Sequence, residues 1–282
     1  MERVQIEKDS IQEELIIPLY RKKMCIEKFP ALFQDEKALE LLSRMDYDFS
    51  EVEKIESKKG RQFDTMEAAI RYNDIVTEIE KFLKNNPYAS IVNIGCGLDQ
   101  TAEKCDNGTC QIYNLDRPDI MEFRNQLLPE TDRIHNLDYE LMDLAWFDEI
   151  EAEQGVLFFA SGVFSKIKRE DIKKLFNEMA LRFPGCRLVF DSMGKVALKM
   201  KLKSWATENK IENLEDYFYV DDTRWDIRPW IKNAKLSEKS YMKAYGNMKE
   251  EALSKSYRFY AKLADKSFKL KIVIIDFANR RN

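Results

Sequence analysis

The sequence predicts an α/β fold in which a mostly parallel sheet carries helices on both faces. From residue 90 onward, short apolar segments alternate with amphipathic ones, which is the pattern of parallel strands buried between two helical layers. A glycine turn, Gly95-Cys96-Gly97, follows the first of these strands, and the next strand ends on Asp116. A strand, a glycine turn, a helix and a second strand with a terminal carboxylate form half of a nucleotide-binding fold.

Helices are expected before the first strand of this sheet. Pro18 can open one helix and Asp35 can cap the next, because proline suits the first helical turn and aspartate accepts hydrogen bonds from its N–H groups. Gly60 separates these helices from residues 64–84, where apolar side chains recur at helical spacing.

Strands and helices alternate along the rest of the chain. We expect strands at residues 90–95, 111–116, 138–143, 155–160, 186–191 and 269–278. We expect helices at residues 99–104, 118–127, 146–151, 169–182 and near 247–263. Residues 193–245 contain many aromatic side chains, but their apolar residues rarely recur at regular helix or strand spacing. We expect a helix, loops and a short antiparallel strand there.

The composition favours a globular protein with one sizeable core. The chain has 282 residues, of which 44% are hydrophobic and 34% charged, and its net charge is -4. A negative net charge argues against a nucleic-acid partner bound through phosphate neutralisation. No apolar run is long enough to span a bilayer and the first residues do not resemble a signal peptide, so no membrane partner is expected.

Cysteine and histidine usage indicates neither disulfides nor a metal site. The five cysteines, an odd number, have no metal-ligand spacing, and His135 is the single histidine. We therefore expect free thiols in a reducing cytoplasm and no bound metal.

The glycine turn narrows the ligand to two classes, dinucleotides and S-adenosylmethionine. A dinucleotide fingerprint requires a third small residue where this chain has Gln100, since close helix packing brings the pyrophosphate to the backbone. Asp99 lies beside the helix N-terminus, where its negative charge would repel a pyrophosphate. Both residues favour S-adenosylmethionine over the cofactor of a nicotinamide-dependent oxidoreductase. An ordinary strand-turn-helix with incidental glycines is a third interpretation.

Polar groups follow the carboxyl ends of the expected strands, where open α/β sheets bind their ligands. Asp116 can accept hydrogen bonds from both ribose hydroxyls, and Asp143-Leu144 can read the adenine edge through a carboxylate and a backbone amide. Ala160-Ser161-Gly162 can form the floor of a pocket. Either aspartate could instead cap the helix that follows it.

Several further motifs follow one another in order from about residue 15 to residue 192. They are Ile17-Pro18-Leu19-Tyr20, Gly60-Arg61 with Ala69-Ile70-Arg71, Val92-Asn93-Ile94-Gly95-Cys96-Gly97, Tyr113-Asn114-Leu115-Asp116-Arg117-Pro118, Leu141-Met142-Asp143, Gln154-Gly155-Val156-Leu157 and Phe183-Pro184-Gly185. Together they resemble the motifs of the leucine carboxyl methyltransferase family, most closely those of its tetracenomycin-type polyketide O-methyltransferase branch. Several motifs in register are more specific than any single one.

The resemblance implies the fold of a class I S-adenosylmethionine-dependent methyltransferase. This is a Rossmann-like sheet of seven mostly parallel strands with helices on both faces, an antiparallel last strand and added N-terminal helices. On this basis residues 1–282 form one domain. Within it, residues 1–62 are an N-terminal helical cap, residues 63–192 the cofactor-binding half, and residues 193–282 the substrate side with the final strands.

The resemblance also implies S-adenosylmethionine as the cofactor and a set of residues that bind it. Arg71 would hold the methionine carboxylate through its planar guanidinium, unless it is an ordinary exposed helix arginine. A second cation could come from Arg21, Lys22 or Lys23. The expected cofactor-binding residues are Arg71, Gly95, Cys96, Gly97, Asp116, Arg117, Asp143, Leu144 and Gln154.

Gln154 departs from the family pattern, which usually has an acidic residue at this position. Glutamine cannot pair with the ammonium of the cofactor. Either the cofactor is held more weakly, or another carboxylate replaces the missing one. A third consequence of Gln154 would be a protein that binds the cofactor with little or no turnover and has a regulatory or assembly role.

The expected reaction is methylation of a carboxylate or hydroxyl oxygen of a small, polyketide-like acceptor. A carboxylate needs no general base, whereas a phenol or alcohol does. His135 is expected at the amino end of its strand, the wrong edge of the sheet for a base, so no catalytic residue is assigned. The N-terminal helices and residues 193–245 are expected to wall the acceptor pocket, although Tyr219, Trp225 and Trp230 could instead pack in the core. The oligomeric state is left open.

Overall fold

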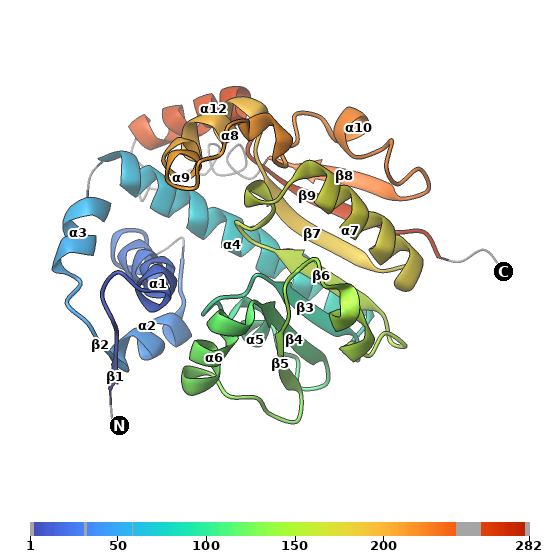
Figure 1. Cartoon of the computed structure of the whole chain (residues 1–282), viewed down its shortest axis with the longest axis horizontal. Coiled ribbons are helices and arrows are strands. Elements are labelled where there is room, and N and C mark those ends of the chain that lie inside the picture. The colour runs from blue at the N-terminus through green and yellow to red at the C-terminus, as the bar shows by residue number, and fades with distance from the viewer. Residues whose placement is uncertain (1–2, 31–32, 58, 241–254, 280–282) are drawn as a thin grey trace.

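A computed structural model describes residues 3–30, 33–57, 59–240 and 255–279 of the chain (Figure 1). Strands within these residues form a seven-stranded sheet with the order β5-β4-β3-β6-β7-β9-β8. The parallel strands are β3 (Ser90–Ile94), β4 (Gln111–Asp116), β5 (Ile134–Asp138), β6 (Val156–Ala160) and β7 (Arg187–Ser192). β9 (Lys271–Asp276) pairs antiparallel with β7 and with β8 (Lys235–Lys239). The predicted α/β fold with an antiparallel last strand is confirmed.

Helices surround this sheet and extend beyond its carboxyl edge. Before it come β1 (Val4–Gln5), α1 (Ile11–Lys28), α2 (Glu36–Ser43), β2 (Met45–Asp46), α3 (Ser50–Glu56) and α4 (Lys59–Asn85). Between the parallel strands lie α5 (Thr101–Lys104), α6 (Pro118–Leu127), the short 3-10 helices η1 (Leu144–Glu149) and η2 (Phe164–Lys166), and α7 (Arg169–Arg182). The later helices are α8 (Lys195–Lys201), α9 (Lys203–Glu208), η3 (Leu214–Asp216), α10 (Thr223–Asp226) and α12 (Lys255–Phe268).

The sheet separates two hydrophobic cores, one on each face. Leu157 and Phe159 of β6 belong to the core that contains Ile70 and other residues of α4. Phe158 belongs to the opposite core, with Phe176 of α7. Side chains alternate between the faces of a strand, so a strand covered on both faces is apolar at every position. This explains the unbroken apolar run of β6.

The strand expected at residues 138–143 is misplaced. β5 covers Ile134–Asp138, and the chain then turns towards η1. β5 is an edge strand with the half-buried polar residues His135 and Asn136, so it lacks the apolar run that marks a strand buried on both faces. The helix expected at residues 146–151 is the 3-10 helix η1.

The N-terminal helices differ from expectation at one boundary. Pro18 lies inside α1, which begins after Ser10, whose Oγ accepts a hydrogen bond from the Glu13 N–H at 3.4 Å. Asp35 caps α2 as predicted, because its Oδ1 accepts from the Ala38 N–H at 3.1 Å.

Two further helices, α4 and α12, extend beyond the ends expected from the sequence. α4 runs through Gly60 and through the expected boundary at residue 62, so one continuous helix joins the N-terminal segment to the sheet. The last helix continues to Phe268, while residues 247–254 of its expected range lie outside the described residues.

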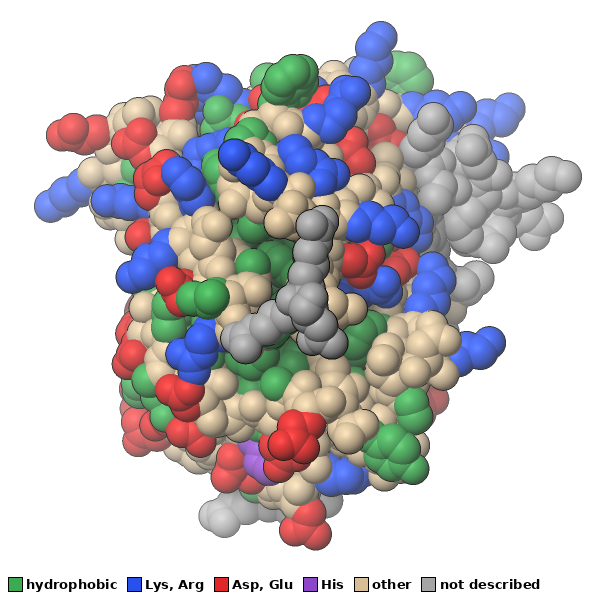
Figure 2. Space-filling model, turned by 90° about the vertical axis from the view of Figure 1, so that its right-hand side faces the viewer, with side chains coloured by type: hydrophobic (Ala, Val, Ile, Leu, Met, Phe, Trp, Pro, Cys, Tyr) green, Lys and Arg blue, Asp and Glu red, His purple; other side chains and the backbone are tan. Residues whose placement is uncertain are grey.

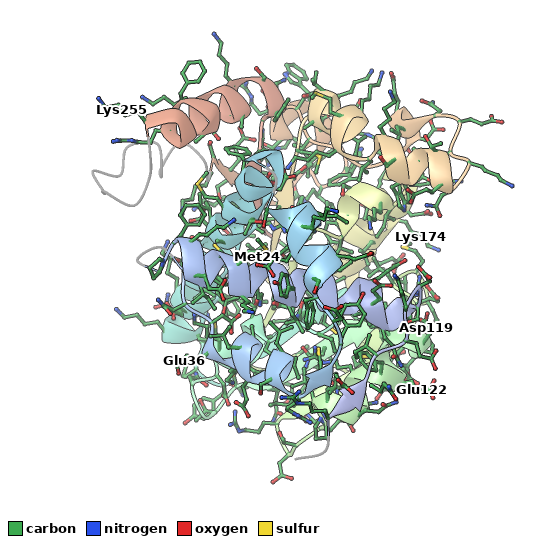
Figure 3. All side chains as sticks on the ribbon, turned by 90° about the vertical axis from the view of Figure 1, so that its left-hand side faces the viewer. Met24, Glu36, Asp119, Glu122, Lys174 and Lys255 are labelled. Atoms are coloured by element: carbon green, nitrogen blue, oxygen red, sulfur yellow. The ribbon has the colours of Figure 1, made fainter. Side chains whose placement is uncertain are left out.

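The helices α1, α2 and α3 lie beside the carboxyl edge of the parallel strands (Figures 1 and 3). α1 packs against both α2 and α4. Leu19 of α1 and Leu41 of α2 share a hydrophobic cluster with Leu98, which follows β3, and Phe123 of α6. This N-terminal cap, residues 3–57 where described, thus covers the edge at which α/β sheets bind ligands.

Charged side chains of both signs are mixed over the face of the molecule drawn in Figure 2. Among the described residues, no helix combines the length and the apolar character needed to cross a membrane.

Candidate functional site

A cavity of about 410 Å³ lies at the carboxyl ends of β3, β4 and β6, and α1 and α4 contribute to its walls. Its volume falls within the range of small-molecule sites. Ser161-Gly162 after β6 lines it, as predicted. The polar and charged residues that line it are Arg21, Lys22, Thr65, Arg71, Tyr72, Asn93, Asp99, Thr101, Asp116, Ser161 and Lys166.

The glycine turn after β3 needs its glycines for two physical reasons. Gly95 has φ +65° and Gly97 has φ +49°, a left-handed conformation that side chains disfavour. A Cβ on Gly95 would lie 2.6 Å from Cγ2 of Val163, which follows β6. The turn therefore brings bare backbone to the cavity, and all three residues of Gly95-Cys96-Gly97 line it.

Asp116 lies at the end of β4 and is bound directly to this turn. Its Oδ2 accepts a hydrogen bond from the Gly97 N–H at 2.8 Å, and its Oδ1 accepts from the Arg117 N–H at 2.9 Å. Burial raises the pKa of Asp116, although these two N–H groups partly offset the effect. The turn and the carboxylate thus form one preorganised unit at the cavity.

Arg124 of α6 is absent from the residues predicted for the site, yet it binds the backbone of the turn. It is fully buried and its Nη1 donates to the carbonyl oxygens of Gly97 and Asp99 at 2.8 and 2.9 Å. Its Nη2 pairs with Glu103 at 2.6 Å. The available signal was an arginine among the buried apolar residues of a short helix, since a buried charge requires partners.

Lys22 of α1 ties the N-terminal cap to the same turn. Its Nζ lies 2.7 Å from Oδ1 of Asp99 and 2.9 Å from Oδ2 of Asp35, and 4.6 Å from the centre of the Tyr72 ring. Burial works against both charges, but the ion pair outweighs it, lowering the pKa of Asp99 and raising that of Lys22.

Asp99 also occupies the start of α5, because its Oδ2 accepts from the Thr101 N–H at 3.0 Å. The protein's own carboxylate therefore stands at this helix N-terminus, where a dinucleotide would place its pyrophosphate. α5 itself has only four residues. Both features disfavour a dinucleotide, in agreement with the interpretation of Gln100.

Arg71 of α4 lines the cavity, but it forms an ion pair within the protein. Its Nη1 lies 3.0 Å from Oδ2 of Asp191 at the end of β7. Oδ1 of Asp191 accepts from the Gly162 N–H at 2.6 Å. Asp191 thus joins α4, β7 and the loop after β6, and Arg71 is not a freely exposed helix arginine.

Four expected cofactor-binding residues do not line the cavity. Gln154 is exposed and lies two residues before β6, whose first residue, Val156, pairs with Ser90 at the start of β3. It therefore lies at the amino edge of the sheet, opposite the cavity, and its assignment is wrong. β6 runs away from Gln154 towards Ser161, so the end of the fourth motif that reaches the cavity is Ser161 and not Gln154.

The other three lie nearer the carboxyl edge. The exposed Arg117 directs its guanidinium to Asp119 at 2.8 Å. Asp143 lies five residues beyond the end of β5 and caps η1, accepting from the Ala145 N–H at 3.3 Å. Leu144 packs against the core beside α7. An adenine role for Asp143-Leu144 therefore stays a prediction.

The described part of the aromatic stretch does not contribute to the cavity. Among its described residues, 193–240, none lines the cavity. Trp225 is 77% exposed, and Trp230 packs against Phe176 and Phe218. His135, near the start of β5, stacks on Tyr113 of the neighbouring strand β4 and does not line the cavity. None of Tyr219, Trp225 and Trp230 lines the cavity, and Trp230 packs in the core, which was the alternative for these residues. Residues of α1 do line the cavity, and their role as a wall of the acceptor pocket stays a prediction.

Solved structures share this architecture at low sequence identity. A DUF574 family protein from Streptomyces avermitilis has a TM-score of 0.50 and 12% identity, over 75% of this chain and 83% of that one. The plantazolicin methyltransferase BamL, solved with a triazolic desmethylPZN analog and SAH, has a TM-score of 0.50 and 11% identity, over 95% of this chain and 99% of that one. The strand order and the site at the carboxyl edge define the class I S-adenosylmethionine-dependent methyltransferase fold.

Sequence comparison identifies the family within this class. The model of the leucine carboxyl methyltransferase family matches residues 20–180, and the chain belongs to this family. It is 24% identical over 184 residues to the tetracenomycin polyketide synthesis O-methyltransferase TcmP of Streptomyces glaucescens. That alignment spans 65% of this chain and 66% of TcmP, just under two thirds of its length.

Proposed function

We propose that the protein is an O-methyltransferase that uses S-adenosylmethionine to methylate a small, polyketide-like acceptor with a carboxylate. The observation that carries this proposal is the unit of Gly95, Gly97 and Asp116 at the cavity, in a chain of the leucine carboxyl methyltransferase family. TcmP, a polyketide O-methyltransferase by name, supports the acceptor class.

The residues present fit S-adenosylmethionine. Gly95 and Gly97 keep the backbone bare where a side chain would fill the turn, and Asp116 would accept hydrogen bonds from ribose hydroxyls. When bound, the cofactor would supply a methyl group activated by a sulfonium charge. The protein would contribute binding, orientation and exclusion of water, the main sources of catalysis in such a transfer.

Asp116, whose pKa burial raises, is assigned to the ribose. The other acidic and thiol groups of the cavity favour a carboxylate acceptor, which requires no general base. Asp99 is a weak base because Lys22 lowers its pKa against the effect of burial. Burial raises the pKa of Tyr72 and of the Cys25 and Cys96 thiols, so all three stay protonated at neutral pH. No imidazole is found among the described residues that line the cavity.

The alternative of a binding protein with little turnover depended on Gln154. Its position at the amino edge, away from the cavity, removes that reason, and we propose an active enzyme. A cytoplasmic location is proposed from the five cysteines, all of them buried free thiols, because thiols stay reduced there.

Calorimetric titration tests the cofactor class. We expect the protein to bind S-adenosylhomocysteine and to give no heat with NAD, because Asp99 opposes a pyrophosphate. No heat with S-adenosylhomocysteine at saturating concentration would overturn the proposal. Methyl transfer to a panel of aromatic carboxylic acids and phenols then tests turnover.

Asp116→Ala locates the ribose in the same titration. We expect a loss of about 1–3 kcal/mol in the free energy of S-adenosylhomocysteine binding, because the ribose hydroxyls lose their acceptor. The matched control is Asp138→Ala, since Asp138 is the exposed neighbour of Asp116 on β5 and does not line the cavity. Equal affinities for the two variants would contradict this placement.

A further inference from the structure

Lys166 differs from the other cations of the cavity in having no carboxylate partner among the described residues. Arg21 pairs with Glu56 at 2.8 Å, Lys22 with Asp99 at 2.7 Å, and Arg71 with Asp191 at 3.0 Å. Each of these charges is balanced within the protein. Lys166 lines the same cavity and is exposed, and no ion pair involves it in the part of the chain that the structure describes.

The backbone that carries Lys166 is held firmly. Lys166 ends η2, whose first residue, Phe164, is buried in the core beside α7. At the start of the loop, the Gly162 N–H donates to Asp191 at 2.6 Å. The Lys166 N–H donates to the Val163 carbonyl oxygen at 3.2 Å. A fixed backbone with an exposed ammonium can present its charge to a ligand without rearrangement of the loop.

The order of the strands separates this charge from the ribose end of the cavity. Asp116 ends β4, the glycine turn follows β3, and Ser161-Gly162 and Lys166 follow β6. β4 and β6 flank β3 on opposite sides. A cofactor bound through Asp116 and the glycine turn would therefore have its remaining neighbours on the β6 side, where Lys166 lies.

We propose that Lys166 selects the acceptor by pairing its ammonium with the acceptor's carboxylate on the β6 side of the cavity. This inference rests on the proposed function and adds a specificity-determining residue to it. An acceptor bound in the cavity would displace water around this exposed ammonium, and fewer solvent dipoles would then screen the pair than in bulk water. An uncharged acceptor of the same shape gains nothing from this pair.

The test compares 2-naphthoate with the isosteric neutral 2-naphthamide as binding probes. Both are titrated calorimetrically into the native protein, with and without saturating S-adenosylhomocysteine. We expect the native protein to bind the carboxylate about tenfold more tightly than the amide. Lys166→Met removes the charge while keeping an unbranched side chain, and should abolish this preference without changing the affinity for S-adenosylhomocysteine.

Two further variants control for structural effects. Lys166→Arg keeps the charge and should retain the preference. Lys168→Met removes a nearby exposed lysine that does not line the cavity, and should leave the preference unchanged. The proposal is overturned if the native protein does not prefer the carboxylate, or if the preference survives in Lys166→Met. Failure to bind S-adenosylhomocysteine would refute the proposed function instead. The two outcomes can be distinguished because the naphthyl probes are also titrated in the absence of S-adenosylhomocysteine.

Discussion

Gly95 is the most constrained residue of the site. Its φ of +65° requires the left-handed conformation, and the branched Val163 side chain occupies the space that a Cβ would need. The first condition is local to the backbone, while the second arises only because β6 pairs with β3. A glycine here therefore serves both the turn and the packing of the neighbouring loop.

Gly95→Ala tests this double constraint. We expect a loss of about 1–3 kcal/mol in the free energy of unfolding from backbone strain, and a further loss from contact with Val163. Urea unfolding measures the combined loss of stability. Gly108→Ala is the control, because Gly108 has φ +84° but no atom within 4 Å of its would-be Cβ. Adding Val163→Ala should recover part of the lost stability; equal losses at Gly95 and Gly108 would show that packing plays no role.

At the scale of elements, Lys22 and Arg124 hold the glycine turn from two sides. Lys22 comes from α1 and pairs with Asp99, while Arg124 comes from α6 and binds two carbonyl groups of the turn. The turn is thus bound on one side by the N-terminal cap and on the other by α6, the helix that follows β4. Its conformation does not depend on its own sequence alone.

Lys22→Met should loosen α1 and lower stability by about 2 kcal/mol at pH 7. The ion pair lowers the pKa of Asp99 below its ordinary 3.8, so this contribution is present above pH 3.8 and is lost as the pH falls through the lowered pKa. It raises the pKa of Lys22 above 10.5, so at the alkaline end the contribution is complete below pH 10.5 and is lost as the pH rises through the raised pKa.

The difference in unfolding free energy between native protein and Lys22→Met should therefore be largest near neutral pH and shrink in acid. Urea unfolding at a series of pH values measures it. Lys23→Met is the control, because Lys23 pairs at 3.7 Å with the exposed Glu27, and a surface pair of this kind contributes little. A difference that does not depend on pH would contradict the role of the pair.

At the scale of the whole molecule, the N-terminal cap and the sheet share their cores. Phe123 and Leu127 of α6 belong to the same cluster as Ile16 and Leu19 of α1, and Cys25 of α1 belongs to the core that contains residues of β3. A surface shared in this way should make the two parts unfold together.

The reactivity of buried thiols tests this cooperativity. Cys25 in the cap and Cys186 before β7 are each 2% exposed, and burial raises the pKa of both thiols, to about 12 for Cys25. Both should react with a thiol reagent only on unfolding, and we expect the same urea midpoint for the two. Site-resolved labelling by mass spectrometry measures each midpoint. Labelling of Cys25 at clearly lower urea would show that the cap unfolds separately.

Sequence alone determined the features that depend on neighbours along the chain. The apolar runs of the inner strands, the glycine turn and the acid after β4 could be recognised because strand, turn and strand end are local patterns. The tertiary structure decided which charges meet. Lys22 with Asp99, Arg71 with Asp191 and Arg124 behind the turn join distant segments, and Gln154 lies on the wrong edge because strand direction fixes where a motif points. Pairing across the fold, which leaves no periodic mark in the sequence, therefore determines which side chains face the cavity and which charge stays available to a ligand.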